Sequence, residues 1–477
     1  MKLSIEGIKD KKEWEKAGIK LPSYDVEKVA SATKSAPVWV HFGIGNIFRI
    51  FIGGIADSLL EQGLSDKGIT CVETFDYDVV DKIYEPFDNL VMAVTLKEDG
   101  STDKKVLGSL TEAVKAQSSV EAEWSRLKTI FASPKLQMVS FTITEKGYAL
   151  HDAKGEFFPF IKSDIDNGPD KAASAMAVVA ALLFERFNTC KAPLAVVSMD
   201  NCSHNGEKLR NSITEMVSEW AKKGFVGEDF VQYVNDENTI SFPWSMIDKI
   251  TPRPADTVAK ALEEAGVEAM APVITSKKTY IAPFVNAEGP QYLVIEDRFP
   301  NGRPQLEKAG VYMTDRDTVN KVERMKVTTC LNPLHTALAV YGCVLGYDLI
   351  ADEMKDSELS ELVRRIGLVE GMPVVTNPGI IDPVKFADEV INVRIPNPFM
   401  PDTPQRIATD TSQKVGIRYG ETIKAYVAKD GSASSLTAIP LAIAGWCRYL
   451  LGVDDNGESF ESVSYTHLRA HETVLDL

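Results

Sequence analysis

The sequence predicts two domains: an α/β domain built on a parallel sheet, and a mostly α-helical domain after it. Three observations support this prediction. The chain has 477 residues, which is long for one domain at roughly 100–200 residues per domain. In the first half, short apolar strands alternate with helical stretches, a pattern typical of parallel α/β sheets. From about residue 318, helical periods replace the strand signals.

The first strand is expected over residues 38–42, and it leads into a turn that contains Gly43 and Gly45. A helix over 50–60 and a strand over 69–72 follow, and this strand ends in an acidic turn at 73–78. Strand, glycine turn, helix, strand and acid form the start of a Rossmann-like dinucleotide-binding unit. Two more strands, over 137–144 and 192–199, end in polar residues, which is where open parallel sheets bind ligands.

The second domain is expected to consist mainly of helices, over 319–341, 356–367, 383–393 and 435–451. We place the Rossmann-like domain at residues 1–295 and the mainly helical, substrate-binding domain at 296–461. Residues 462–477 continue no preceding pattern, and we expect them to be a non-native tail. We therefore assign no role to His467 and His471, and the natural sequence beyond about residue 461 stays open.

Composition excludes several classes of function. The chain has 52 Lys and Arg against 68 Asp and Glu, a net charge of −16, which argues against a nucleic-acid-binding groove. No stretch approaches the ~18 uncharged apolar residues of a membrane span, and the charged N-terminus does not resemble a signal peptide, so we expect a cytosolic protein. The six cysteines show no metal-binding spacing, so we expect free thiols and no metal. A small-molecule partner is the remaining expectation, for a monomer or small homo-oligomer.

The glycine turn carries the predicted cofactor site. Gly43 and Gly45 allow the backbone to approach a pyrophosphate at the N-terminus of the following helix. Phe48 stands where the usual fingerprint has its third glycine, so we expect looser or differently shaped packing there. Any of Glu73, Asp76 or Asp78 could bind the ribose hydroxyls, and a carboxylate there would repel a 2′-phosphate, which favours NAD over NADP. The predicted cofactor-binding residues are Gly43, Gly45, Asn46, Phe48, Arg49, Asp76 and Asp78.

The segment from Lys326 to His335 carries the predicted chemistry. It brings Lys326, Asn332 and His335 into ten residues at the head of a helix, with Glu323 before them. A buried lysine can act as a general base toward an alcohol, and an asparagine amide can donate to a developing alkoxide. His335 can bind a substrate hydroxyl.

Seven segments, in order, resemble a known family. They are HFGIG at 41–45, TITEKGY at 142–148, SMDNCSHNG at 198–206, SFP at 241–243, IDKITP at 247–252, EDRFPNGR at 296–303, and the Lys326/Asn332/His335 segment. On these motifs the chain resembles the polyol-specific long-chain dehydrogenases of the mannitol dehydrogenase family, over nearly its whole length to about residue 460.

The resemblance implies metal-independent hydride transfer between C2 of a linear sugar alcohol or acid and the nicotinamide of NAD. It implies that Lys326 is the general acid/base and that Asn201 and Asn332 polarise the C2 oxygen. It also implies that His335 orients the substrate and that Glu323 relays the proton toward solvent. The substrate-binding residues that it implies are Asp248, Arg406 and Lys414.

One departure from the family pattern predicts a local distortion. The family usually places its asparagine five residues after the lysine, whereas Asn332 follows Lys326 by six. On a regular helix the step from Lys326 to His335 would then turn about 180° and separate the two side chains. We therefore predict a bulge or break around 328–331 that absorbs the extra residue. Pro333 fits such a break, because it has no N–H and would clash with the preceding turn of a regular helix.

Two substrates share this machinery: anionic D-mannonate/D-fructuronate and neutral mannitol/fructose. The Ser-Gln-Lys triplet that ends at Lys414 resembles the fructuronate-reducing members of the family more than its mannitol dehydrogenases. This favours the uronate, with mannitol 2-dehydrogenase as the alternative. A different class of function, a non-catalytic NAD(H)-binding sensor, is disfavoured by the intact Lys326, Asn332, His335 and Asn201.

Overall fold

The computed structural model describes residues 1–97, 99–400, 402–409 and 411–460. The chain forms two compact units. Unit 1 comprises residues 1–96 and 102–319, and unit 2 comprises 97–101 and the chain from residue 320 onward. The expected non-native tail, 462–477, lies outside the described residues.

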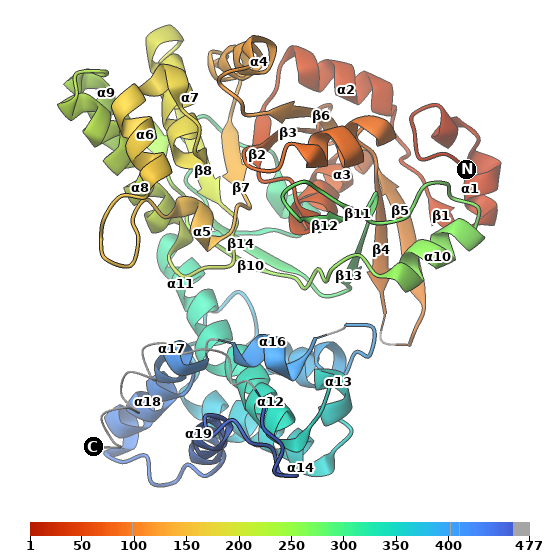
Figure 1. Cartoon of the computed structure of the whole chain (residues 1–477), viewed down its shortest axis with the longest axis vertical. Coiled ribbons are helices and arrows are strands. Elements are labelled where there is room, and N and C mark those ends of the chain that lie inside the picture. Colours follow the sequence, from red (N-terminus) through yellow and green to blue (C-terminus); the bar gives the residue numbers. More distant parts are fainter. Residues whose placement is uncertain (98, 401, 410, 461–477) are drawn as a thin grey trace. The chain divides into compact units, whose positions relative to one another are not determined.

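Unit 1 is built on a six-stranded sheet in which every neighbouring pair is parallel. The strand order is β6-β3-β2-β7-β8-β9 (Figure 1). In chain order this is 3-2-1-4-5-6, the doubly wound order of dinucleotide-binding domains, whose order reverses between β2 and β7. The strands are β2 (Trp39–Phe42), β3 (Ile69–Glu73), β6 (Leu110–Lys115), β7 (Met138–Phe141), β8 (Leu194–Ser198) and β9 (Ile240–Ser241).

Side chains alternate between the two faces of this sheet, because successive residues of a strand point in opposite directions. Val40 and Val139 belong to one hydrophobic core, shared with helices that include α4 (Glu121–Phe131), α7 (Ala175–Thr189) and α8 (Asn205–Lys222). Their neighbours Trp39 and Met138 belong to a second core, shared with α3 (Gly53–Glu61). Both faces are buried, which explains why the strands are apolar runs rather than alternating patterns.

Three smaller sheets complete unit 1. The first has the order β1-β5-β4-β13 and is formed by β1 (Ile19–Lys20), β4 (Val91–Leu96), β5 (Thr102–Leu107) and β13 (Phe284–Glu288). The second has the order β10-β14-β15, formed by β10 (Ser245–Asp248), β14 (Tyr292–Glu296) and β15 (Tyr312–Thr314). The third is the hairpin of β11 (Val273–Ile274) and β12 (Tyr280–Ile281). The remaining helices of this part are α1 (Lys11–Lys16), α2 (Val26–Ser35), α5 (Glu145–Tyr148), α6 (Pro159–Asn167), α9 (Glu228–Asn235) and α10 (Asp256–Glu264).

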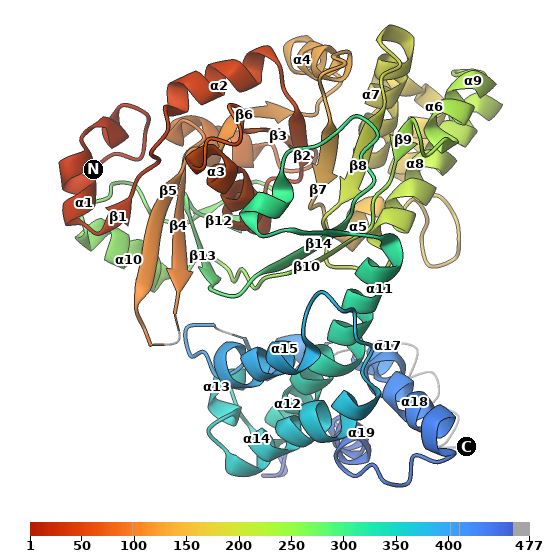
Figure 2. The same cartoon turned by 180° about the vertical axis from the view of Figure 1, so that it is seen from behind.

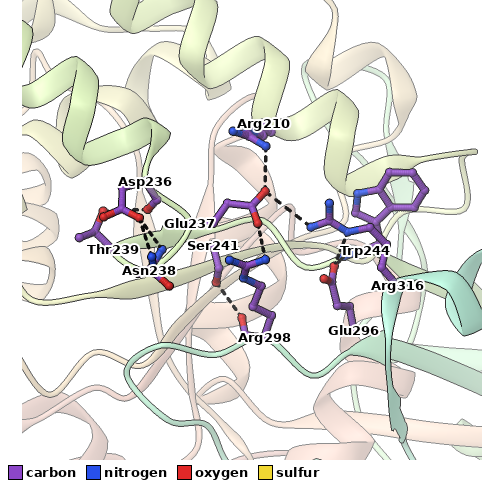
Figure 3. Close-up of polar contacts among 10 residues, drawn as sticks. All are labelled: Arg210, Asp236, Glu237, Asn238, Thr239, Ser241, Trp244, Glu296, Arg298 and Arg316. Atoms are coloured by element: carbon purple, nitrogen blue, oxygen red, sulfur yellow. Dashed lines mark hydrogen bonds and ion pairs between the residues drawn. The ribbon is translucent and has the colours of Figure 1, made fainter.

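Residues 296–319 belong to unit 1, whereas the sequence-based boundary lies at 295/296. Strand β15 pairs with β14 in parallel, which extends the small sheet to Thr314. An ion-pair cluster adds to this attachment (Figure 3). Glu237 contacts Arg210 at 2.8 Å and Arg298 at 2.5 Å, and Arg316 donates to Glu296 at 3.0 Å. These contacts join residues far apart in the sequence, so local patterns do not reveal them.

Unit 2 is helical, and helices occupy the four expected ranges, but the range 319–341 is divided at Leu331 into two α-helices joined by a π-helix. Its α-helices are α11 (Arg316–Met325, beginning in unit 1), α12 (Asn332–Leu345), α13 (Ile350–Glu353), α14 (Ser357–Arg364), α15 (Pro383–Glu389), α16 (Pro404–Ala408), α17 (Thr411–Val415), α18 (Glu421–Asp430) and α19 (Ala438–Tyr449). In the described part of unit 2, π-helices interrupt or join them at Lys326–Cys330, Arg365–Gly371, Val390–Arg394 and Gly416–Gly420.

Helix α12 is the central helix of unit 2. It packs against α13, α14, α16 and α19, and Figure 2 shows it beside α13, α14 and α19. Its side chains are buried around most of its circumference, from Pro333 to Val344. A helix that is apolar on all sides belongs in a core, and the residues at its N-terminus are therefore held by packing on several sides.

Candidate active site

The glycine turn after β2 has the shape expected for close backbone approach. Gly43 has φ +86°, and a Cβ atom on it would lie 2.3 Å from the carbonyl oxygen of Thr142 at the end of β7. Only glycine fits there, for both conformational and steric reasons. Gly45 is exposed, and no atom outside its immediate neighbours lies within 4 Å of the place where its Cβ would stand. The turn therefore leaves open space beside the backbone of Gly45.

The helix that follows begins at Asn46. The side-chain Oδ1 of Asn46 is buried and has no hydrogen-bond partner among the described residues. A buried acceptor without a partner is costly, and such atoms in native proteins commonly await a ligand or a water molecule. The open space at Gly45 and the N–H groups of a helix N-terminus suit a phosphate group, whereas the Oδ1 of Asn46 is an acceptor and would need a donor such as a ligand hydroxyl.

Phe48 and Arg49 lie inside the protein. Phe48 is fully buried, and its ring stacks on His41 with centroids 4.0 Å apart. The fully buried guanidinium of Arg49 donates to the carbonyls of Ala282 and Pro283, at 2.7 and 3.0 Å. We therefore propose that both side chains support the turn, in place of the cofactor contact that we expected from the sequence.

The differently shaped packing expected at Phe48 is confirmed. The helix opens with a π-helix, Phe48–Ile52, before it continues as α3. Phe48 is the first residue of this π-helix, at the position where the usual fingerprint has a glycine.

The three acidic residues after β3 have different surroundings. One carboxylate oxygen of Glu73 accepts the backbone N–H groups of residues 74, 75 and 76, at 3.0, 2.9 and 3.2 Å, and burial raises the pKa of this carboxyl. Asp76 accepts the hydroxyl of Thr275 at 2.6 Å. Asp78 accepts the N–H of Ser276 and is paired with Lys82, both at 2.8 Å. Glu73 thus caps the turn, while the two aspartates attach it to the β11–β12 hairpin.

Asp78 is the most accessible of the three carboxylates. Its side chain is 26% exposed, whereas Glu73 and Asp76 are buried. The Lys82 ammonium, together with the hydrogen bond from Ser276, lowers the pKa of Asp78 to about 2. A carboxylate that is ionised and accessible can accept hydrogen bonds from ligand hydroxyls.

The loops at the carboxyl ends of β7 and β8 are fixed to each other. Asp200 accepts the backbone N–H groups of Ile143 and Thr144, both at 2.9 Å, and the hydroxyl of Tyr148 at 2.5 Å. Burial raises the pKa of the Asp200 carboxyl. Asn205 exchanges hydrogen bonds of 2.9 and 3.0 Å with the backbone of Ser245. Asn201 is exposed within this doubly anchored loop, so its position is set by its neighbours. Asp248 lies at the end of β10 and is buried.

The predicted bulge between Lys326 and Asn332 is confirmed. Residues Lys326–Cys330 form a π-helix, and Leu331 leaves helical geometry with φ −133° and ψ −63°. Helix α12 then begins at Asn332, with Pro333 in its first turn. The extra residue between Lys326 and Asn332 is therefore accommodated close to residues 328–331, where we predicted the distortion.

Four of the predicted catalytic residues lie on this one segment. Lys326 is 2% exposed, and Glu323, Asn332 and His335 are half-buried. Glu323 belongs to α11, Lys326 opens the π-helix, and Asn332 and His335 lie in the first turn of α12. A buried ammonium next to a break in the helix is an unusual feature, because lysine is seldom fully buried.

The two predicted substrate-binding cations also lie in unit 2. Arg406, on α16, is 64% exposed and ion-paired with Asp402. Lys414, on α17, is half-buried. Helix α16 packs against α12, and the π-helix that follows α17 packs against the π-helix of Lys326. The elements that carry both cations therefore adjoin the Lys326–His335 segment.

No local pattern in the sequence predicts a further set of contacts to this segment. The side chains of Arg418, Tyr419 and Thr422 bond to residues 328–336. They follow Lys414 by four to eight residues, and in the sequence they look like ordinary residues of a helix.

Two further observations concern the described part of the chain. It holds no group of three or more His, Cys, Asp and Glu side chains placed to bind a metal ion. None of its helices has the length and apolar character needed to cross a membrane.

Three known proteins resemble this chain over most of its length. A D-mannonate oxidoreductase of Thermotoga maritima is 54% identical over 464 residues, which cover 97% of this chain and 85% of the relative. A solved D-sorbitol dehydrogenase in substrate-free form has a TM-score of 0.80 at 27% identity, covering 94% of this chain and 86% of that one. The mannitol 2-dehydrogenase of Pseudomonas fluorescens, solved with NAD and D-mannitol, has a TM-score of 0.73 at 27% identity, covering 96% and 86%.

Two family models match the chain in sequence order. The mannitol dehydrogenase Rossmann domain matches residues 38–308, and the mannitol dehydrogenase C-terminal domain matches residues 318–474. The chain therefore belongs to the mannitol dehydrogenase family.

Proposed function

We propose that this chain is an NAD-dependent oxidoreductase that interconverts D-mannonate and D-fructuronate, with Lys326 as its general acid/base. The single observation that carries the choice of substrate is the 54% identity to a D-mannonate oxidoreductase over 97% of the chain. The mannitol- and sorbitol-specific relatives of known structure are only 27% identical.

The cofactor site is proposed at the glycine turn. The backbone at Gly45 and Asn46 would hold the pyrophosphate, and Asp78 would accept hydrogen bonds from the adenosine ribose, with Asp76 buried behind it. The open space at Gly45 supports the pyrophosphate position, and the unpartnered Oδ1 of Asn46 could accept a hydrogen bond from a cofactor hydroxyl. When bound, NAD would accept or donate a hydride at nicotinamide C4.

The proton would be handled by Lys326. In the reductive direction, C2 of the keto acid gains a hydride, and its oxygen takes a proton from the Lys326 ammonium. Asn201 and Asn332 would donate hydrogen bonds to that oxygen as negative charge develops on it. His335 would orient the neighbouring hydroxyl, and Glu323 would pass a proton between Lys326 and solvent.

The substrate carboxylate is proposed to bind Arg406 and Lys414, with Asp248 accepting hydrogen bonds from substrate hydroxyls. Charge-assisted hydrogen bonds to a carboxylate are roughly twice as strong as neutral ones. A cationic pair therefore favours a uronate over a neutral ketose.

The alternative, a mannitol 2-dehydrogenase, is supported by the TM-score of 0.73 to a mannitol 2-dehydrogenase, since hydroxyl groups can also bind to arginine and lysine. Steady-state kinetics separate the two. We expect kcat/KM with NADH to be higher for D-fructuronate than for D-fructose. The reverse order would establish the alternative, and NADH binding without turnover of either sugar would point to a sensor.

A further inference from the structure

We propose that Tyr419 and Thr422 are positioning residues for the reaction, because they fix the helix break that sets Lys326 relative to Asn332 and His335. The inference rests on the proposed function, since it assigns them a role in that reaction. Neither side chain is proposed to touch the substrate or the cofactor.

The break itself creates the need for outside support. A π-helix pairs each carbonyl with the N–H five residues later, and Leu331 N–H donates to the Lys326 carbonyl at 3.1 Å in this way. The carbonyl of Thr328 would pair with residue 333 by the same rule. That residue is Pro333, which has no N–H, so this bond cannot form.

Thr422 supplies a donor at this position. Its hydroxyl donates to the carbonyl of Thr328 at 3.1 Å. Thr422 is 3% exposed and Thr328 is 7% exposed, so water has little access to either group. A buried carbonyl without a donor costs about 1–3 kcal/mol, which gives the break a strong dependence on this hydroxyl.

Tyr419 holds the other side of the break. Its hydroxyl donates to the carbonyl of Pro333 at 2.8 Å, and the side chain is fully buried. The neighbouring Arg418 donates to the hydroxyl of Thr336, which in turn donates to the carbonyl of Asn332 at 2.8 Å. The segment 418–422 therefore bonds to the chain on both sides of Leu331.

Close packing at two glycines also restricts the break. A Cβ on Gly371 would lie 2.7 Å from the methyl group of Thr329, and one on Gly367 would lie 3.2 Å from Leu334. The π-helix Arg365–Gly371 thus approaches the break closely. The glycine packing and the hydrogen bonds from 418–422 both restrict the position of Lys326 relative to Asn332.

The segment 418–422 also continues directly from Lys414. Helix α17, the π-helix Gly416–Gly420 and α18 follow one another without a gap. A displacement of Lys414 on binding a substrate anion would therefore reach the hydroxyls of Tyr419 and Thr422. One continuous helical segment therefore carries Lys414, which is a proposed substrate contact, together with Tyr419 and Thr422, which hold the helix break.

The test compares single hydroxyl deletions. Thr422→Val and Tyr419→Phe remove the donors and keep the shapes, Thr422→Ser keeps the donor, and Tyr426→Phe removes a hydroxyl of α18 that has no described bond to residues 326–336. We expect the two deletions to lower kcat with D-fructuronate by about 10- to 100-fold, as small misplacements of reacting groups do. KM for NADH should stay unchanged, the pH profile of kcat should shift, and Thr422→Ser and Tyr426→Phe should behave as wild type.

Thermal denaturation separates positioning from folding. If both deletions lower the Tm but keep the wild-type kcat and its pH profile, the two residues are only structural and the inference is overturned. An equal loss of kcat in the control variant Tyr426→Phe would overturn the inference as well. If the wild type turns over neither sugar, the proposed function is contradicted, and so is the positioning role that rests on it. Full activity in the wild type and in both deletions would remove the positioning role alone.

Discussion

The backbone N–H of Leu331 donates to the carbonyl of Lys326 at 3.1 Å, five residues back instead of four. This bond closes the π-helix in which the proposed general acid/base lies. It also absorbs the one extra residue between Lys326 and Asn332. The proposed catalytic groups are thus placed by an interrupted helix, whose geometry depends on buried contacts from other parts of unit 2.

Two glycines of the cofactor turn should respond differently to alanine. Gly43→Ala should destabilise unit 1, because its φ is +86° and the new Cβ would overlap the Thr142 carbonyl. Gly45→Ala should leave the Tm unchanged, because the space around it is open. It should still weaken NADH binding, by about 1–3 kcal/mol if the methyl group overlaps the bound pyrophosphate. Fluorescence titration with NADH measures the affinity of each variant, and thermal denaturation measures its Tm. An unchanged NADH affinity in Gly45→Ala would show that the pyrophosphate does not bind at this turn.

Asp78 should control the choice between NADH and NADPH. Its ionised carboxylate would repel a 2′-phosphate, so Asp78→Asn should raise kcat/KM for NADPH relative to NADH. The asparagine can still accept the N–H of Ser276, which limits damage to the turn. Asp81→Asn, which changes a carboxylate paired with Lys115, is the matched control. If the ratio of kcat/KM for NADPH to that for NADH rises in Asp76→Asn but not in Asp78→Asn, the ribose contact belongs to Asp76.

A substitution at Lys414 should affect the two candidate substrates differently. Lys414→Gln keeps a donor but removes the charge, so KM for D-fructuronate should rise by about tenfold, in line with the loss of a charge-assisted bond. KM for D-fructose should change much less. Parallel kinetics with both sugars provide the measurement, and equal effects on the two would assign Lys414 to hydroxyl binding.

Glu353 should make the stability of unit 2 fall as the pH rises from about 4.5 to about 9. It is fully buried on α13, neither of its carboxylate oxygens has a hydrogen-bond partner among the described residues, and burial raises its pKa to about 9. The folded state therefore keeps a proton that the unfolded state has lost above its ordinary pKa of 4.5. Stability should fall between these two values as pH rises, by up to about 1.4 kcal/mol per pH unit.

Glu353→Gln is the matched test of this dependence. The amide has the same shape and no charge, so the variant should be more stable than the wild type at pH 8–9, and its unfolding should depend less on pH. Urea denaturation at several pH values measures the slope. Identical slopes in the two proteins would show that Glu353 is not protonated in the folded state.

Local signals in the sequence predict much of the fold and part of the site. The glycine turn, the strands that follow one another in the sheet, and the helices of unit 2 depend on short-range patterns of apolar residues and glycine. The bulge at 326–330 could be predicted because the step from Lys326 to Asn332 is one residue longer than in the family that the chain resembles, and a regular helix would then separate Lys326 from His335. In these cases the cause lies within a few residues of the effect.

Other features depend on residues that are distant in sequence. The buried guanidinium of Arg49 bonds to carbonyls more than 230 residues away, and Thr422 bonds to a carbonyl 94 residues before it. The unit boundary at residue 319 depends on the pairing of β15 with β14 and on the arginines around Glu237. No spacing or periodicity in the sequence predicts such contacts, because they form only when distant elements pack together.

Single-turnover oxidation of NADH by D-fructuronate, in the wild type and in Lys326→Ala, tests the central claim most directly. Enzyme in excess over NADH reports the chemical step, and NADH titration with thermal denaturation shows that the variant is folded and loaded. We predict a rapid transfer in the wild type, faster than with D-fructose, and a loss of about 10²–10⁴-fold in Lys326→Ala. A folded, NADH-binding variant that keeps the wild-type rate would contradict the assignment of Lys326, and a wild type that prefers D-fructose would contradict the uronate.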